Sequence, residues 1–329
     1  MGFFSRKSNI DPNSEHRDWE LVSSIAQTSL NEQKKARRWG IFFKILTFVY
    51  ITFVLVSIFM QNRDTGSGFN FADPHTGVVY VEGVIADGEE ASANNIVTGL
   101  RRAFESEGSK AVMLIINSPG GSPVQAGYVY DEVKRLRVLY PDKKVYAVIK
   151  DLGASGGYYI AAAADEIYAD KASLVGSIGV TASSFGFVDL MEKAGVERRN
   201  FTSGEHKSFL DPFAPLKENE KQFWESVLQK THDQFIRVVK EGRGDRLANN
   251  GDLFTGLIWN GEQAVELGLI DGLGSPGSVA RDIIGHKEFK NYTPRLSPLE
   301  EFTKRFGVAV GVGMGKVLGV SSDNPIQLR

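Results

Sequence analysis

The sequence predicts an α/β domain with a largely parallel sheet, preceded by one apolar helix of membrane-spanning length. Short apolar runs of buried-strand type alternate with helical patterns between residues 77 and 290. A sixteen-residue run without charge, Ile45 to Met60, lies ahead of that region. The whole chain has 329 residues, which is enough for a large core.

The apolar run near the N-terminus has the length and the flanking charges of a membrane anchor. Adding Trp39 to Lys44 lengthens it to about 22 residues, close to the roughly 20 that cross a hydrocarbon core. Four basic residues precede it, so the positive-inside bias places the N-terminus in the cytoplasm: Lys34, Lys35, Arg37 and Arg38. We expect a cytoplasmic segment at 1–38, a transmembrane signal-anchor at 39–62 and a linker at 63–76. A cleaved signal peptide is the alternative, but some 40 residues precede the run.

The elements of the domain at 77–290 follow from the period of the apolar residues. Strands are expected where short runs are continuously apolar, and helices where apolar residues recur every three to four positions. In chain order, the prediction is strands Val78–Val81 and Val84–Ile85, helix Asn94–Ser106, strand Ala111–Ile116, helix Val124–Leu139, strand Val145–Ile149, a small-residue helix Ser155–Ala164 and helix Glu218–Glu241. The tail at 291–329 contains an apolar, Gly-rich segment, which we expect to dock on a neighbouring subunit or the membrane surface.

Composition excludes several classes of function. Lys and Arg number 38 and Asp and Glu number 40, so no basic excess indicates nucleic-acid binding. Cysteine is absent, which excludes a thiol nucleophile, a zinc–thiolate site and disulfides. The five histidines show no metal-ligand spacing. We expect no nucleic-acid partner, no metal and no cofactor.

Ser155 is the first candidate for chemistry. It lies in Gly153-Ala154-Ser155-Gly156-Gly157, between a predicted strand and a predicted helix, and fits the G-x-S-x-G pattern. A serine at such a turn exposes its hydroxyl while the helix N-terminus points backbone N–H groups at the same place. The alternative is that the small residues allow close packing and that Ser155 is a helix N-cap. The pentapeptide alone leaves both interpretations open.

A second motif, Asn117-Ser118-Pro119-Gly120-Gly121, ends the predicted strand Ala111–Ile116. Turns at the carboxyl ends of parallel strands lie where α/β sheets bind ligands. The two glycines let the backbone approach a ligand closely. This arrangement suits an oxyanion hole with one donor from Gly121 and one from Gly156. A Pro-Gly turn without function is the alternative.

The general base has several candidates. A histidine could serve, and the chain offers His206, His232 and His286 after Ser155. Lys207 could also serve, provided that burial lowers its pKa well below the reference value near 10.4. Three phenylalanines near it could supply that burial: Phe201, Phe209 and Phe213. Spacing alone does not exclude a solvated loop lysine.

Taken together, the motifs resemble the signal peptide peptidase A family of Ser-Lys serine proteases. The resemblance covers roughly residues 77 to 275 and is carried by Asn117–Gly121, Gly153–Tyr159, Gly176–Val180, Ser203–Lys207 and Thr255–Asp271. It implies Ser155 as nucleophile, Lys207 as general base, Gly121 and Gly156 as oxyanion donors, and Ser177 as an accessory hydroxyl that holds the lysine amine.

The resemblance also implies an architecture and a location. The family fold is the ClpP/crotonase type, a spiral of ββα units, and its members form rings in which adjacent units share a site. One set of motifs indicates the short, single-unit form, in a homo-oligomeric ring of about eight subunits. The expected location is the bacterial inner membrane, with the catalytic domain on the extracytoplasmic side.

The expected function is therefore a membrane-anchored serine endopeptidase. Its peptide substrates would be signal-peptide remnants or other hydrophobic peptides near the membrane. Three alternatives stay open: an α/β-hydrolase-type esterase that uses Ser155 and a histidine, a catalytically inactive membrane scaffold, and a crotonase-type acyl-CoA enzyme.

Overall fold

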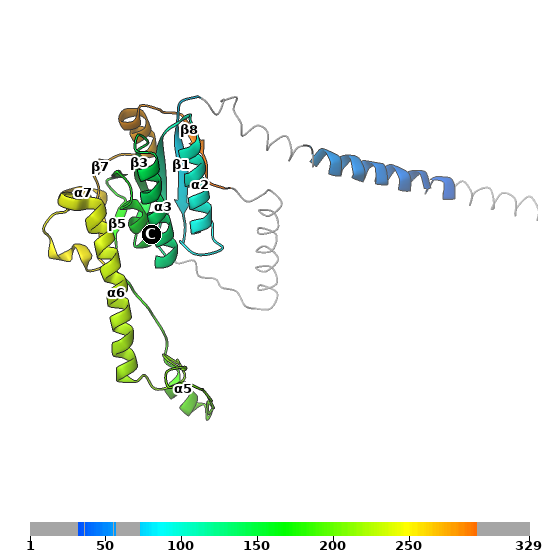
Figure 1. Cartoon of the computed structure of the whole chain (residues 1–329). Helices are drawn as coiled ribbons and strands as arrows, with labels where there is room; N and C mark the ends of the chain where they lie inside the picture. The colour runs from blue at the N-terminus through cyan, green and yellow to red at the C-terminus, as the bar shows by residue number, and fades with distance from the viewer. Residues whose placement is uncertain (1–31, 36, 55, 57–72, 295–329) are drawn as a thin grey trace, which may run out of the picture. The chain divides into compact units, whose positions relative to one another are not determined.

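The computed structural model describes residues 32–35, 37–54, 56 and 73–294. The chain divides into two units, and the larger one, Phe69–Val308, contains the sheet and the helices that cover it. Figure 1 shows the sheet strands running side by side with α2 and α3 alongside them. The candidate catalytic residues all belong to this larger unit.

The N-terminal region forms a helix over the described residues 32–35, 37–54 and 56. Among the described residues, no helix combines the length and the apolar character that crossing a membrane requires. Part of the expected span at 39–62 lies outside the described residues, as do residues 1–31, most of the expected linker and the tail from residue 295.

Eight strands form one sheet. They are β1 (His75–Glu82), β2 (Ser109–Ser118), β3 (Val145–Ala154), β4 (Glu166–Ala169), β5 (Leu174–Gly176), β6 (Ile258–Asn260), β7 (Gly272–Leu273) and β8 (Phe289–Asn291). The main order is β6-β5-β3-β2-β1-β8, and β4 pairs with both β3 and β7. Every pair is parallel except β5 with β6. The predicted α/β class with a largely parallel sheet is confirmed.

The helices lie between the strands in sequence. They are α2 (Ala93–Glu105), α3 (Pro123–Leu139), α4 (Gly156–Ala161), α5 (Val188–Lys193), α6 (Glu218–Arg243), α7 (Gly261–Glu266) and α8 (Pro276–Ser278), with the short turns η1 (Gly244–Arg246), η2 (Gly251–Phe254) and η3 (Val279–Ile284). The start of α3 shows why the chain turns where it does. Pro123 occupies the first turn, and the Ser122 side chain caps it by accepting a hydrogen bond from the Gln125 N–H.

Alternation along the strands builds two apolar layers, because successive side chains of a strand point to opposite faces. On one face, Leu114 and Ile116 of β2 join a large cluster with residues of α2, α3, α4 and α6. On the other face, Met113 and Ile115 join a smaller cluster with Val279 of η3. Each fully buried Leu or Ile stabilises the fold by roughly 1.5–3 kcal/mol.

Two predicted elements differ from the structure. The strand at Val84–Ile85 is wrong, because only Ile85 pairs, through an isolated bridge to Gly121. The predicted helix Ser155–Ala164 is shorter, since α4 ends at Ala161 and Ser155 lies just before it. Ser155 therefore lies at the junction of β3 and α4, outside the regular backbone of either element.

One segment stands away from the sheet. Residues 182–216, here called the arm, contain α5 and include no buried residue. Figure 1 shows α5 beside the N-terminal end of α6, at the opposite end of that helix from the sheet. A segment without a buried residue adds little to the stability of a single chain, so the arm is a candidate for contacts with other molecules.

Candidate active site

Ser155 adopts a strained backbone conformation at the end of β3. Its φ is 51° and its ψ is −121°, a combination that L-residues other than glycine rarely adopt. Two hydrogen bonds hold it there. The Ser155 N–H donates to the Gly176 carbonyl at 2.9 Å, and the Ser155 carbonyl accepts from the Tyr159 N–H at 2.9 Å. Strain that the surrounding structure maintains is a common feature of functional positions.

The N-cap alternative for Ser155 lacks its defining contact. Although Ser155 occupies the N-cap position of α4, its side chain makes no capping hydrogen bond. Ser155 is half-buried and lines a cavity of ≈ 630 Å³. The side chain is therefore placed for chemistry in the cavity and does not serve to close the helix.

The turn after β2 lies directly against Ser155. A β-carbon added to Gly120 would stand 2.7 Å from the Ser155 Cβ and 2.6 Å from the Gly156 nitrogen, and its φ is +96°. No other residue fits there without moving Ser155. The Gly121 nitrogen lies 3.4 Å from the place that a β-carbon on Gly156 would occupy. The two motifs that were predicted to supply one oxyanion hole are thus in contact.

The Gly121 and Gly156 amides are available as donors. Gly156 is the first residue of α4, where helix geometry leaves the N–H without an intrahelical partner. Gly121 pairs with Ile85 only through its neighbours: the Ile85 N–H donates to Gly120, and the Ser122 N–H donates to Ile85. Within the described part of the chain, neither amide donates a hydrogen bond. Two free donors beside a serine hydroxyl suit an oxyanion.

Ser177 faces the same cavity from the end of β5. It also has a φ of 51°, and its N–H donates to the Leu257 carbonyl at 2.8 Å. Gly176 before it has a φ of +107°. The structure therefore brings together four of the five predicted site residues, since Ser155, Gly156, Gly121 and Ser177 all line the cavity.

The remaining wall comes from α6 and was not predicted. Thr231 and Phe235 of α6 line the cavity, as does Tyr159 of α4. Burial raises the pKa of Tyr159, so its phenol stays protonated at neutral pH. A β-carbon on Gly242 would lie 2.0 Å from the Ala162 carbonyl oxygen, so α6 approaches the end of α4 as closely as backbone allows. No local sequence pattern could predict that contact, because Gly242 and Ala162 lie far apart in the sequence.

Lys207 does not line the cavity. It lies on the arm with an exposed side chain, and the neighbouring His206 Nδ1 is 4.0 Å from Glu220 Oε1 on the first turn of α6. Glu220 and Thr231 are eleven residues apart on that helix, or roughly 16 Å along its axis. Within one chain, the predicted serine and lysine are therefore separated by more than a side chain can reach.

The histidines do not supply the missing base either. Among the described residues, no histidine lines the cavity. The His232 Nε2 lies 3.1 Å from the Ile178 carbonyl, which ties α6 to the segment after Ser177. His206 is exposed on the arm. A Ser-His esterase would need one of these rings at Ser155, and the geometry offers none.

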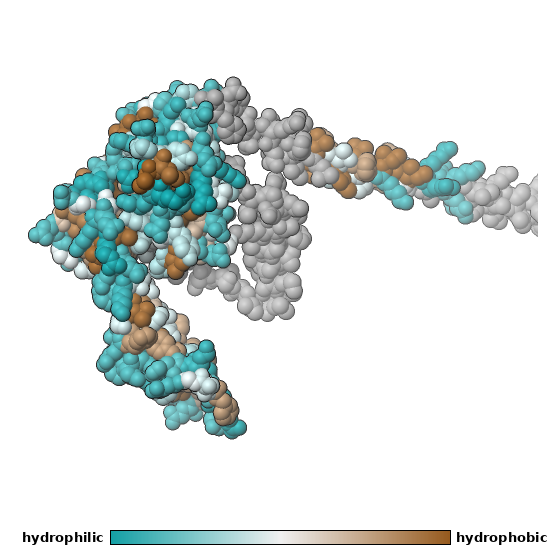
Figure 2. Space-filling view, viewed as in Figure 1, coloured by the Kyte–Doolittle hydropathy of each residue, from teal (hydrophilic) through white to brown (hydrophobic). Residues whose placement is uncertain are grey.

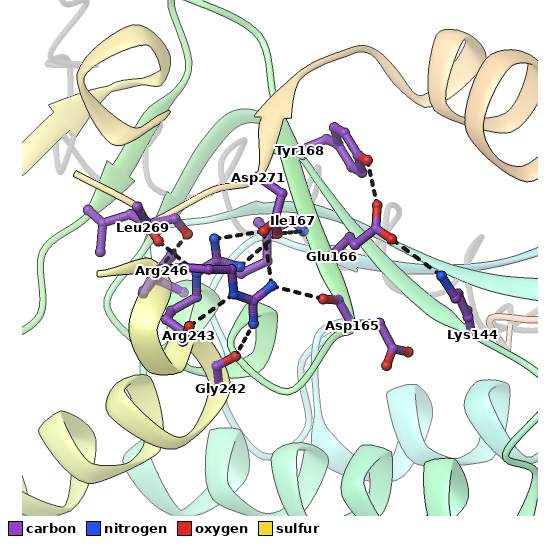
Figure 3. A network of polar contacts seen from close by, with 12 residues as sticks. Lys144, Asp165, Glu166, Ile167, Tyr168, Gly242, Arg243, Arg246, Leu269 and Asp271 are labelled. Atoms are coloured by element: carbon purple, nitrogen blue, oxygen red, sulfur yellow. Dashed lines mark hydrogen bonds and ion pairs between the residues drawn. The ribbon is translucent and has the colours of Figure 1, made fainter. Parts of the chain in front are cut away.

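A buried polar network joins α4 and α6, two of the helices that line the cavity (Figure 3). Arg243 at the end of α6 donates from its Nε to the Gly268 carbonyl and from its two terminal nitrogens to Asp271. The Tyr158 hydroxyl of α4 donates to the Leu269 carbonyl at 2.6 Å, and burial raises the pKa of that phenol. These contacts fix α4, and hence the Gly156 amide, relative to α6.

Two family models match the chain. Residues 139–288 match peptidase family S49, and residues 77–173 match Clp protease. The first range contains Ser155, Ser177 and Lys207, and the second contains the Gly121 turn and Ser155. The parallel-rich sheet described above is consistent with a ClpP-like fold.

Several curated proteins are similar to this chain. It is 48% identical over 188 residues to the Na(+)/H(+) antiporter NhaA of Brucella abortus (strain 2308). The aligned region covers 57% of this chain and 25% of that protein. It is 35% identical over 202 residues to a putative signal peptide peptidase SppA of Enterococcus faecium, over 59% of this chain and 58% of the relative. It is 32% identical over 197 residues to the putative protease slr0021 of Synechocystis sp., over 60% of this chain and 69% of the relative.

The extent of these matches differs. The chain spans about a quarter of the length of the antiporter and less than two thirds of the Enterococcus relative, but more than two thirds of the Synechocystis one. The matched ranges of the two family models and the names of the protease relatives agree on the family. The chain belongs to peptidase family S49.

Proposed function

We propose that the protein is a membrane-anchored serine endopeptidase in which Ser155 is the nucleophile and Lys207 of a neighbouring subunit is the general base. The observation that carries the proposal is the strained Ser155 with its hydroxyl in a cavity beside two unpaired amides. Such an arrangement stabilises the tetrahedral intermediate of acyl transfer. Membership of peptidase family S49 supports peptide bonds as the substrate.

The reaction follows from the roles of these groups. The neutral Lys207 amine takes the proton of the Ser155 hydroxyl while Oγ attacks the peptide carbonyl carbon. The Gly121 and Gly156 N–H groups donate to the oxyanion. Lys207 then gives its proton to the leaving amine as the C–N bond breaks, which leaves an acyl ester on Ser155. Water, deprotonated by Lys207, hydrolyses the ester, and Ser177 holds the lysine amine during both steps.

A lysine from another subunit is favoured by the position of the arm. An exposed amine about three turns of α6 away from the cavity cannot reach Ser155 in its own chain. A head-to-tail contact between identical subunits would place it in a neighbour's cavity, and repeated head-to-tail contacts close into a ring. We propose a ring of about eight subunits on the family resemblance.

The surface of the arm fits such a contact. Phe185 is 78% exposed, Leu190 is 63% exposed and Phe201 is 91% exposed. Figure 2 shows apolar surface on the arm, at the lower end of the view, among hydrophilic residues. Large apolar side chains gathered on one exposed segment are typical of protein–protein contact sites.

The proposed location rests on the sequence ahead of the domain. The uncharged run Ile45 to Met60 and the basic residues before it would anchor the chain with the catalytic domain outside the cytoplasm. A protease held beside the bilayer would meet signal-peptide remnants and other hydrophobic peptides near the membrane. These substrates are proposed for that reason.

Mixed subunits test the proposal. Ser155→Ala and Lys207→Ala proteins are each expected to be inactive on a fluorogenic peptide. Mixing equal amounts, with dissociation and reassembly, should restore about a quarter of the wild-type rate, because one site in four then receives an intact serine and an intact lysine. If the lysine acted within its own chain, mixing would restore nothing.

Controls separate the alternatives. Lys193→Ala, on the same arm, should keep the wild-type rate. Full turnover by Lys207→Ala would contradict the lysine base and favour an esterase-type mechanism. Failure of the assembled wild-type protein to acquire a fluorophosphonate label at Ser155 would favour an inactive scaffold.

A further inference from the structure

The strand that carries the oxyanion donor has an irregular pairing with the end of β1. Glu82 pairs with Asn117, whereas Ile85 pairs with Gly121. From Glu82 to Ile85 is three residues, but from Asn117 to Gly121 is four. The turn after β2 therefore contains one extra residue. An insertion of this kind is a β-bulge, and it redirects the backbone groups that follow it.

A donor is missing at this bulge. The Gly83 N–H donates to the Asn117 carbonyl at 3.0 Å, as in a regular parallel ladder. The next ladder bond would join the N–H of residue 119 to the Gly83 carbonyl. Residue 119 is proline, which has no N–H. The Gly83 carbonyl would therefore lack its ladder partner.

The Ser118 hydroxyl fills that place. It donates to the Gly83 carbonyl at 2.6 Å and accepts a hydrogen bond from the Gly120 N–H at 3.1 Å. Ser118 is 0% exposed, so water does not compete for these bonds. After it, the ladder resumes, with the Ile85 N–H donating to the Gly120 carbonyl at 2.9 Å. One buried hydroxyl therefore spans the gap in the ladder.

This bridge determines where the Gly121 amide points. Because Ile85 bonds to the residues on either side of Gly121, the Gly121 N–H is directed away from β1 and toward Gly156. We infer that Ser118 is a positioning residue that holds the Gly121 amide as an oxyanion donor. The inference rests on the proposed peptidase function and adds to it a residue that touches neither the substrate nor the nucleophile.

Packing explains why the position requires a small hydroxyl residue. A β-carbon added to Gly157, in the first turn of α4, would lie 3.3 Å from the Ser118 Cβ and 3.0 Å from its carbonyl oxygen. A larger side chain at 118 would push α4 and its Gly156 amide away. Alanine fits but cannot bridge, so the Gly83 carbonyl and the Gly120 N–H would both lose their partner.

The test uses Ser118→Ala, Pro119→Ala and the double variant of the full chain. The measurements are the rate of acylation by a fluorophosphonate and the kcat and KM for a fluorogenic peptide. Ser118→Ala should slow acylation and lower kcat by roughly 10–100-fold, with little change in KM, because a displaced oxyanion donor acts on the transition state. Pro119→Ala restores a backbone N–H that can donate to the Gly83 carbonyl. In the Pro119→Ala background, Ser118→Ala should therefore lower the acylation rate and kcat by less than about threefold.

A nearly isosteric variant separates positioning from folding. Ser118→Cys keeps the volume but forms weaker hydrogen bonds, and it should give an intermediate rate at an unchanged melting temperature and assembled mass. If Ser118→Ala is acylated at the wild-type rate, the inference is overturned. It is also overturned if Ser118→Ala lowers the acylation rate by the same factor with Pro119 present and with Pro119→Ala. A folded wild-type protein that takes no label would instead overturn the proposed function itself.

Discussion

Arg243 and Asp271 form a bidentate ion pair in the interior of the domain (Figure 3). The Arg243 Nη1 lies 2.7 Å from the Asp271 Oδ2, and its Nη2 lies 3.0 Å from Oδ1. Asp271 also accepts a hydrogen bond from the Ile167 N–H at the start of β4. The pair therefore joins the end of α6, which forms one wall of the active-site cavity, to the sheet.

We predict that Asp271→Asn strongly destabilises the domain. Burial by itself would raise the pKa of Asp271, but the hydrogen bonds from Arg243 and Ile167 outweigh it and hold the pKa below its ordinary value. The substitution leaves the Arg243 charge buried and unpaired, and its expected cost is about 3 kcal/mol. Chemical unfolding of the full chain measures it. Asp282→Asn, in the exposed pair with Arg281, should leave the unfolding midpoint nearly unchanged.

A second prediction concerns the strain at Ser155. Ser155→Ala and Ser155→Gly should both abolish fluorophosphonate labelling, because both lack the hydroxyl. Only glycine adopts a φ of 51° and a ψ of −121° without strain, so Ser155→Gly should be more stable than Ser155→Ala by about 1 kcal/mol. Parallel melting curves measure the difference. Equal stability would mean that the turn stores no strain.

A third prediction is a pH dependence that arises from His75. His75 is 4% exposed, with its Nδ1 2.6 Å from the Asp73 carbonyl and its Nε2 2.8 Å from the Tyr292 hydroxyl. Burial lowers the pKa of His75, and the charges of Lys290, Lys143 and Lys110 act in the same direction, whereas the Asp73 hydrogen bond opposes them. The folded protein therefore keeps this ring neutral at a pH where the unfolded chain binds a proton.

The sign follows from that difference. Above pH 6.5 both states hold a neutral ring and stability is unaffected. As the pH falls below 6.5, the unfolded state binds more protons and stability declines toward the lower, folded pKa. His75→Gln should flatten this part of the curve, as measured by unfolding at a series of pH values between about 5 and 7.

A fourth prediction concerns assembly. Phe201 on the arm is 91% exposed, and Phe201→Ser should weaken self-association by tenfold or more if this ring is an anchor of the contact. The mass of the detergent-solubilised protein at several concentrations measures it, and peptidase activity should fall in parallel. Val138→Ser, 81% exposed on α3, is the matched control. Unchanged mass for Phe201→Ser would exclude this ring from the interface.

Part of the candidate site could be predicted from the residues themselves, because Gly121 and Ser155 follow predicted strands. Ser155 and Ser177 come directly after β3 and β5, Gly121 lies in the turn that follows β2, and the carboxyl ends of parallel strands meet at one edge. The meeting of Gly121 and Ser155 followed from the fold class, whereas Ser177 was expected only from the family resemblance, because no strand was predicted before it. Lys207 carries no such constraint, since it follows no strand and lies on the arm, which includes no buried residue.

Other features could not be predicted for physical reasons. The apolar run of β3 stops at Ile149, yet the strand continues through Lys150 and Asp151 because β5 pairs with its second half. Strands as short as β7 offer too few residues for a period to be recognised. The α6 wall depends on the close approach of Gly242 to Ala162, which is a contact between distant segments.

The bond between His75 and Tyr292 has a consequence for how this domain is connected. The first residue of β1 touches the residue that follows β8, and the two strands run side by side. The polypeptide thus nearly closes on itself. A short linker could join these two points and allow new termini elsewhere in a circular permutant. For the same reason, the domain can be inserted into a longer polypeptide at a single loop without separating the flanking segments.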